Sequence, residues 1–359
     1  MPALDQTMER VLALAREAGT PAAAVARDLV AAHLEALGYQ VQRQRFAFTP
    51  SSLNGLPVFG AGLGGLALLL LPLLTGERAP GWAASLVLAG GLLLLAVLAM
   101  GIGLGWLPLG GATREDANLI ATRGGVPVRR WIMAHLDTKA QIQSMAGRLV
   151  AVWVIGMAVA GLAALAVARL RGIVPVPLAG MAAASAVVAG ALAGRGRLRG
   201  TTPGARDNGT GLAGALAAAE GLEDAATGIL ITGAEEFGLV GARVFVAQRA
   251  DELREAVVVN LDTIDQEGEL ALVSHDARGA ALAGREAARL AASGLAARLR
   301  RLPVGILTDS LPFARAGIPA LTIGRLTWRT LRTIHTPQDT AAGLSLETAV
   351  RVGRALAAN

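Results

Sequence analysis

Four long stretches of the chain are apolar from end to end and contain no charged residue. As a helix, each stretch is long enough to cross a bilayer hydrocarbon core of roughly 30 Å. They form two pairs, and a short polar turn that contains arginine divides each pair. Glycine and alanine recur within them, which favours close packing of helices in lipid. We therefore predict two transmembrane hairpins, with spans at residues 56–74, 83–107, 149–168 and 173–194.

The rest of the chain has the hydrophobic pattern of an α/β domain. Residues Met8–Leu37 repeat with helical periodicity, and Gly38 is placed to end that helix. Short apolar runs rich in β-branched residues predict buried strands. These runs are VQRQRFAF at 41–48, NLIATRGG at 118–125, RRWIMAHL at 129–136, TGILITGA at 227–234 and EAVVVNLDT at 255–263. Residues 211–222 and 280–299 are predicted to form helices that cover the sheet.

The apolar pairs interrupt this α/β pattern. The predicted soluble segments are 1–50, 113–147 and 197–359, and the predicted hairpins occupy 51–112 and 148–196. Each hairpin returns the chain to the side of the membrane that it left. We therefore expect the three soluble segments to form one α/β domain on one face of a bilayer.

Five short polar motifs lie between residues 135 and 340 and carry side chains that bind divalent metals. In chain order they are AHLDT with His135 and Asp137, GARDNGTG with Asp207, GAEEFG with Glu235 and Glu236, VNLDT with Asp262, and IHTPQDT with His335. Imidazole nitrogens and carboxylate oxygens are ligands that Zn²⁺ prefers. Two histidines and three carboxylates can hold two metals if one carboxylate bridges them. Any single acid could be a solvated loop residue, but the five motifs together favour a two-metal hydrolase site.

In order and in local sequence, the motifs resemble those of the zinc exopeptidases of metallopeptidase clan MH. That family includes the bacterial leucyl aminopeptidases, aminopeptidase Y and glutamate carboxypeptidase II. The stretch TDSLPFARAGIPAL at Thr308–Leu321 also resembles a segment of the family. The resemblance covers most of the chain outside the four apolar stretches. It implies a single mixed-sheet α/β exopeptidase domain with helices on both faces.

The resemblance also implies a ligand set and an activity. Two zinc ions would be bound, with Asp207 as the bridging ligand. The remaining ligands would be Glu236 and His335 for one ion, and His135 and Asp262 for the other. The implied function is an aminopeptidase that hydrolyses short peptides.

Two further acids, Glu235 and Asp137, are expected to take part in catalysis without binding metal. A water held between two divalent cations has a strongly lowered pKa. The resemblance implies that Glu235 is the general base, which takes a proton from that water and hands it to the leaving amine. Asp137 lies two residues after His135 and is expected to fix the tautomer of that imidazole.

The sequence departs from the family pattern at the group that stabilises the oxyanion. Many members place a tyrosine there, but the one tyrosine of this chain is Tyr39, far from the motifs, and Ile334 precedes the last histidine. A metal, or another donor such as Trp328 or a backbone amide, would then supply the stabilisation. His33 is expected to be a surface or boundary residue of the N-terminal helix, and the ligand set is complete without His275.

Three alternatives to an aminopeptidase share parts of this pattern. A zinc carboxypeptidase, dipeptidase or other amidase could use the same ligands, because no residue that recognises the amine or carboxylate of a substrate is identified. A catalytically silent membrane scaffold or receptor would keep the fold, although such relatives usually lose ligands. A transporter is less favoured, because the four spans contain none of the charged residues that mark transport pathways.

The composition favours a membrane protein and argues against nucleic acid as a partner. Hydrophobic residues make up 53% of the chain and charged residues 17%, whereas about a quarter of the residues of a soluble domain are charged. The net charge is +6, but aromatic residues make up only 3% and no basic stripe is present. The expected partners are a peptide substrate and the lipid bilayer. The absence of cysteine excludes disulfides and thiolate metal sites.

Arginines close to the predicted spans indicate an orientation. On the side of the α/β domain these are Arg43, Arg45, Arg114, Arg148, Arg195, Arg197 and Arg199, whereas the hairpin turns hold Arg78, Arg169 and Arg171. The positive-inside rule then favours a cytoplasmic catalytic domain. The first residues are charged throughout and do not predict a cleavable signal peptide. The expected location is the plasma membrane of a bacterium, with several spans.

Overall fold

A computed structural model describes residues 3–107, 109, 112–173, 176–302 and 305–358. The chain forms two compact units, and each is assembled from segments that are far apart in sequence. The sheet unit comprises residues 1–48, 113–140 and 200–359, and the helical unit comprises residues 49–112 and 141–199. The two units are described separately below.

The sheet unit is organised around an eight-stranded mixed sheet in the described part of the chain, in the order β1-β2-β4-β3-β5-β8-β6-β7. The central strands β4, β3, β5 and β8 run parallel to one another, whereas β1 and β2 are antiparallel at one edge. The strands are β1 Gln40–Phe48, β2 Arg114–Thr122, β3 Arg130–His135, β4 Thr227–Thr232, β5 Val257–Ile264, β6 Glu269–Ser274, β7 Ala297–Arg300 and β8 Ala320–Leu326. The predicted mixed-sheet α/β fold is confirmed.

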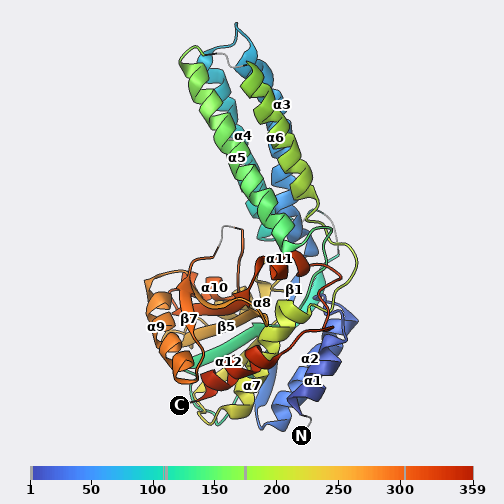
Figure 1. Cartoon of the computed structure of the whole chain (residues 1–359), viewed down its shortest axis with the longest axis vertical. Coiled ribbons are helices and arrows are strands. Elements are labelled where there is room, and N and C mark those ends of the chain that lie inside the picture. Colours follow the sequence, from blue (N-terminus) through green and yellow to red (C-terminus); the bar gives the residue numbers. More distant parts are fainter. Residues whose placement is uncertain (1–2, 108, 110–111, 174–175, 303–304, 359) are drawn as a thin grey trace. The chain divides into compact units, whose positions relative to one another are not determined.

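Helices cover both faces of this sheet, because alternate residues of each central strand point to opposite sides. On β3, Ile132 belongs to a core shared with α1, α2, α7, α9 and α12, while Trp131 belongs to a core shared with α8 and α10. Figure 1 shows these helices around the sheet. Their bounds are α1 Leu4–Leu12, α2 Pro21–Ala36, α7 Gly211–Gly221, α8 Val240–Arg249, α9 Ala277–Ala292, α10 Ser310–Arg315, α11 Trp328–Thr333 and α12 Glu347–Ala357.

Three details of the sequence-based prediction are wrong. The single helix expected over Met8–Leu37 is two helices, because Thr20 caps a new helix whose first residue is Pro21. The helix expected over 280–299 ends at Ala292, and Ala297–Arg300 instead pairs as a strand with β6. His33 is buried instead of lying at the surface, since α1 packs over it and its Nδ1 lies 3.0 Å from Thr7 Oγ1.

Among its described residues, the helical unit has four long helices. Figure 1 labels them α3 to α6. They are α3 Gly55–Thr75, α4 Gly81–Gly103, α5 Met145–Leu170 and α6 Val176–Gly194, and the short 3-10 turn Pro50–Asn54 precedes α3. All four are long and apolar enough to cross a membrane. The second is shorter than the predicted span of 83–107, because it ends at Gly103 and the next residues form a turn.

Close approach of backbones holds this helical bundle together. A Cβ atom added at Gly60 of α3 would lie 2.5 Å from Ala193 Cβ, and one added at Gly190 of α6 would lie 2.6 Å from Gly60 O. Arg169 near the end of α5 donates hydrogen bonds to the carbonyls of Gly76 and Ala79, in the turn between α3 and α4. Small residues therefore set the spacing of the helices, and one buried arginine ties the two hairpins together.

Candidate metal centre

The residues of the five motifs meet at one edge of the sheet. His135 is the last residue of β3, Glu235 and Glu236 follow β4, and Asp262 lies near the end of β5. These three strands are adjacent and parallel, so their carboxyl ends lie side by side, where α/β sheets commonly place their sites. Two loops complete the cluster, with Asp207 in the irregular turn Ala205–Thr210 before α7 and His335 just after α11.

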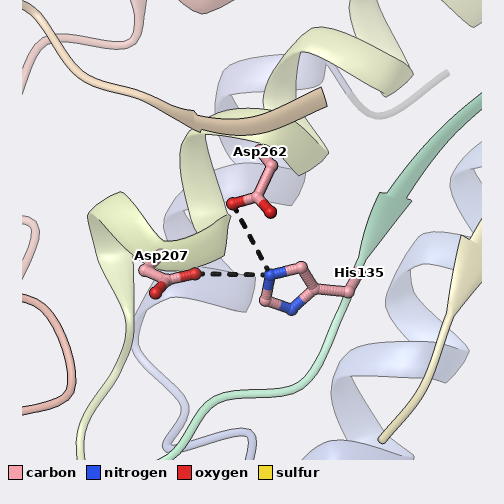
Figure 2. A group of neighbouring side chains, drawn as sticks. All are labelled: His135, Asp207 and Asp262. Atoms are coloured by element: carbon pink, nitrogen blue, oxygen red, sulfur yellow. Dashed lines mark ion pairs between the residues drawn. The ribbon is translucent and has the colours of Figure 1, made fainter. Parts of the chain in front are cut away.

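Two groups of potential metal ligands result, and they share Asp207. In the first group, His135 Nε2 lies 3.3 Å from Asp207 Oδ1 and 3.9 Å from Asp262 Oδ1 (Figure 2). In the second group, His335 Nε2 lies 3.1 Å from Asp207 Oδ2 and 3.3 Å from Glu236 Oε2. The two oxygens of Asp207 therefore face two different histidines.

The donor set fits two divalent cations. Within each group, one donor atom from each residue lies within 4.8 Å of the others, and the residues are buried or nearly so. Glu236 Oε1 has no hydrogen-bond partner among the described residues. A buried carboxylate oxygen without a partner costs free energy, which a metal ligated there would offset. Nitrogen and oxygen donors of this kind suit zinc.

The loop that carries Asp207 is fixed by two side chains that lie outside both ligand groups. The carboxylate of Asp339 accepts hydrogen bonds from the amides of Arg206 and Asp207, at 2.9 and 3.1 Å. Asn208 donates to Leu261 O at 2.8 Å and accepts from the amide of Thr263 at 3.1 Å. The loop is thereby attached both to the segment that follows His335 and to the end of β5.

Asp137 supports the site in a different way from the one predicted. His135 Nδ1 lies 3.1 Å from the main-chain carbonyl of Asp137, whereas the nearer carboxylate oxygen is 3.7 Å away. The carboxylate instead accepts hydrogen bonds from the amides of Glu235 and Glu236, at 3.0 and 3.2 Å. The imidazole tautomer is therefore set by a backbone carbonyl, and the carboxylate orients the Glu-Glu pair.

Backbone strain is concentrated here. Four described residues other than glycine have a positive φ, and three of them lie at or beside the site. Ala234 (φ 51°) precedes Glu235, Thr263 (φ 52°) follows Asp262, and His335 itself has φ 64°. Conformations of this kind cost of order 1–3 kcal/mol each and persist where the surroundings enforce them. The fold thus holds these side chains in positions that local preference would not give.

Two positively charged residues that the sequence analysis did not select also lie at the centre. Arg16 is fully buried and donates hydrogen bonds to the carbonyls of Leu136, at 2.8 Å, and Gly204, at 3.1 Å. Burial lowers its pKa to about 10. Lys139 is also buried, and its Nζ lies 2.5 Å from Glu236 Oε2. A signal for Lys139 was present, because it is the one lysine of the chain and follows His135 by four residues.

The acids of the second ligand group are held ionised. Burial acts to raise the pKa of Asp207, but hydrogen bonds with His135 and His335 hold it well below its ordinary value. Burial likewise opposes ionisation of Glu236, yet His335 and Lys139 lower the pKa of that carboxyl to about 2. Both carboxylates are therefore available as ligands at neutral pH.

In three other buried carboxyl groups the pKa is raised instead of lowered. Burial, with the negative charges of Glu236 and Asp309, raises the pKa of Glu235 well above its ordinary value. Burial raises the pKa of Asp262 to about 6 and that of Asp309 to about 7. A carboxylate with a raised pKa accepts a proton more readily, which is the property that a general base requires.

The remaining histidine and the tyrosine are engaged elsewhere. His275 Nε2 lies 2.9 Å from Ser310 Oγ, and His275 belongs to neither ligand group. Tyr39 is buried, and its hydroxyl donates to Ala219 O at 3.2 Å. Trp328 is half-exposed, with the guanidinium of Arg332 5.8 Å from its ring centroid.

Comparison with known proteins gives a family match over part of the chain and a shared fold. The sequence model of Peptidase family M28 matches residues 190–359, which include all the motif residues except His135 and Asp137. A comparison with curated protein sequences gives no match.

Solved structures with the same fold include a zinc aminopeptidase from Bacillus subtilis (TM-score 0.59, 16% identity, 99% of this chain and 94% of that chain covered). An aminopeptidase from Aneurinibacillus sp. strain AM-1 has a TM-score of 0.58 at 17% identity, over 98% of this chain and 92% of that chain. A glutaminyl cyclase from Fimbriiglobus ruber has a TM-score of 0.57 at 16% identity, over 99% and 94%. Residues 190–359 therefore match peptidase family M28, and the chain shares its fold with solved zinc aminopeptidases.

Proposed function

We propose that the protein is an integral-membrane aminopeptidase that uses two zinc ions to release N-terminal residues from short peptides. The observation that carries the proposal is the position of Asp207, whose two carboxylate oxygens face His135 and His335 at 3.3 and 3.1 Å. One carboxylate can then bridge two metals. Asp262 would complete one metal site and Glu236 the other.

The bound metals would act as Lewis acids and would lower the pKa of water at the site. Glu235 is the residue best placed to accept the proton of the attacking water. It belongs to neither ligand group, and its Oε2 lies 4.0 Å from His135 Nε2. The carboxylate of Asp137 accepts a hydrogen bond from the amide of Glu235, which fixes the backbone that carries the Glu235 side chain. The same carboxyl group would then pass the proton to the leaving amine.

The assignment of base and ligand is tested by two matched variants, Glu235→Gln and Glu236→Gln. Glu235→Gln should keep two zinc ions and lose turnover by roughly 10²–10⁴-fold, as removal of a general base typically does. Glu236→Gln should lose zinc. Zinc content and turnover, both measured on detergent-solubilised protein, decide the matter, and exchanged phenotypes would reverse the two roles.

Substrate end specificity is tested with blocked peptides. An aminopeptidase cleaves a peptide with a C-terminal amide but not one with an acetylated N-terminus, and a carboxypeptidase shows the reverse preference. A peptide that begins with glutamine separates hydrolysis, which releases free glutamine, from cyclisation, which releases ammonia. A protein that binds no zinc and cleaves none of these peptides would be a membrane scaffold.

Membrane insertion is supported by the outer surface of the helical unit. Its four helices are long and apolar, and they expose large apolar side chains to the surroundings. Examples are Leu68, Leu69, Leu86, Leu93, Leu94, Trp153, Met157 and Met181, each more than half exposed. A soluble protein rarely exposes apolar patches of this extent, whereas lipid tails would cover them.

The sheet unit is proposed to face the cytoplasm, on the positive-inside rule. Because the chain contains no cysteine, single substitutions give a clean test. Glu77→Cys lies in the turn between α3 and α4, and Ser293→Cys lies on the surface of the sheet unit. In intact cells stripped of their outer layers, a membrane-impermeant maleimide should label the first position and spare the second. The reverse pattern would place the active site outside.

A further inference from the structure

The side chain of Lys139 occupies an unusual place for a lysine. It is the one lysine of the chain, and all other basic residues are arginine. The residue is only 4% exposed, and its ammonium group lies 2.5 Å from Glu236 Oε2 and 3.5 Å from the carbonyl of Glu236. A buried lysine is costly unless it is paired, so this contact fixes the ammonium group at the carboxylate.

The ammonium contacts the carboxylate oxygen that a metal would need. Glu236 Oε2 is the oxygen that lies 3.3 Å from His335 Nε2, within the second ligand group. The other oxygen, Oε1, has no hydrogen-bond partner among the described residues. A metal bound by Asp207, Glu236 and His335 would therefore share its carboxylate with a fixed positive charge.

The first ligand group has no such neighbour. Asp262 lies near His135. In the described part of the chain, it forms no ion pair with a lysine or an arginine. The two groups share Asp207, and the ion pair of Lys139 with Glu236 is one difference between them. Repulsion between a divalent and a monovalent cation at a few ångströms is strong in a buried site, where the effective dielectric constant is low.

We propose that Lys139 is a positioning residue that holds Glu236 and weakens metal binding by the Asp207–Glu236–His335 group, so that the two metals bind in separate steps. The group of His135, Asp207 and Asp262 fills first. The second zinc ion then binds only when the concentration of free zinc approaches the dissociation constant of the weaker step. This inference rests on the proposed two-metal site and adds an order of loading to it.

The test is metal titration of the full chain in detergent, after chelator treatment, with Zn²⁺ and a competing indicator dye. The wild type should bind two ions with dissociation constants that differ by at least tenfold. Glu236→Gln should remove the weaker step, and Asp262→Asn should remove the tighter one. Removal of the tighter step by Glu236→Gln would overturn the proposed order.

Lys139 itself is tested with three variants. Lys139→Met removes the charge, Lys139→Gln removes the charge but keeps a hydrogen-bond donor, and Lys139→Arg keeps the charge. Both neutral variants should tighten the weaker step by roughly tenfold or more, whereas Lys139→Arg should leave it within about threefold of the wild type. If circular dichroism shows that Lys139→Met does not fold, Lys139→Gln still tests the effect of removing the charge.

Two further outcomes separate this inference from the proposed function. A weaker step that stays unchanged or becomes weaker still in the neutral variants would overturn the role of Lys139 and leave the two-metal site intact. A wild-type chain that binds no zinc would overturn both.

Discussion

The candidate metal centre of the sheet unit and the helical unit bury opposite kinds of side chain. Around the candidate metal centre, the sheet unit buries histidines, carboxylates, one lysine and one arginine. The helical unit buries mainly alanine, glycine and leucine, and it turns leucine, methionine and tryptophan outward. In the sheet unit, partners offset the cost of removing charges from water. In the helical unit the packed side chains are themselves apolar, so close packing distinguishes one helix contact from another.

This difference implies that the two units fail in different ways. A change at the metal centre removes a specific partner and leaves a charge uncompensated. A change in the helix bundle alters the spacing of backbones while the site keeps its ligands. Substitutions in each unit test this contrast when they are compared by metal content and by thermal stability.

The largest effect is expected from Asp207→Ala. Its carboxylate faces both histidines and would touch both metals, so its loss should empty or disorder both sites and reduce turnover by at least ~10⁴-fold. Zinc content measured by atomic absorption checks the prediction. Asp251→Ala, at an exposed acid that pairs with Arg254, is the matched control and should keep both zinc ions. Two zinc ions retained in Asp207→Ala would contradict the bridging role.

A smaller effect is expected from Asp339→Ala. This side chain binds no metal in our proposal, but it fixes the amides of Arg206 and Asp207. Loss of a hydrogen-bonded support behind a ligand typically costs 10–100-fold in metal affinity. The dissociation constants for zinc should rise by roughly that factor, with the fold intact by circular dichroism. Unchanged affinity would show that the Asp207 loop holds its position without Asp339.

Within the helical unit, Gly60→Leu should destabilise the bundle. The new side chain would collide with Ala193 and Gly190, and overpacking of this kind typically costs 1–3 kcal/mol. The midpoint of thermal unfolding in detergent should fall, while zinc content stays at the wild-type level. Gly65→Leu on the same helix is the control, because no atom lies within 4 Å of an added Cβ there. A loss of zinc in Gly60→Leu would mean that the two units do not fail independently.

A dependence of stability on pH is expected from Asp309. Burial raises the pKa of this carboxyl from 3.8 to about 7, so the folded protein binds a proton more tightly than the unfolded chain. The associated stability is present below pH 4 and is lost as pH rises to 7, with a slope of at most ~1.4 kcal/mol per pH unit. Chelator-treated wild type should therefore lose stability relative to Asp309→Asn between pH 5 and 7. If the melting temperatures of wild type and Asp309→Asn changed equally with pH across this range, the raised pKa of Asp309 would be contradicted.

The sequence predicted the mixed α/β sheet because its strands are short apolar runs that end in polar motifs. The same pattern predicted which side chains would meet, since His135 ends β3 and Asp262 lies near the end of the neighbouring parallel strand β5. The sequence also predicted the four apolar helices, although α4 ends four residues before the predicted limit. In each case, a local pattern determines a local structure.

The supporting contacts were missed because they join residues that are far apart and follow no pattern. Arg16 reaches carbonyls that lie 120 and 188 residues away, and Asp339 holds amides that lie more than 130 residues before it. The break between α1 and α2 was also missed, although Thr20 and Pro21 are a local signal for the start of a helix. Asp137 was selected correctly as a neighbour of His135, but its carboxylate binds backbone amides that only the folded sheet brings to it.

The interleaved order of the two units has a consequence for synthesis on the ribosome. Strand β3 is made before helices α5 and α6, but its pairing partners β4 and β5 are made after them. A nascent chain cannot hold a complete ligand group until Asp262 has been made, which is well after the last long apolar helix ends at Gly194. The four helices are thus all synthesised before the first complete group of potential metal ligands exists.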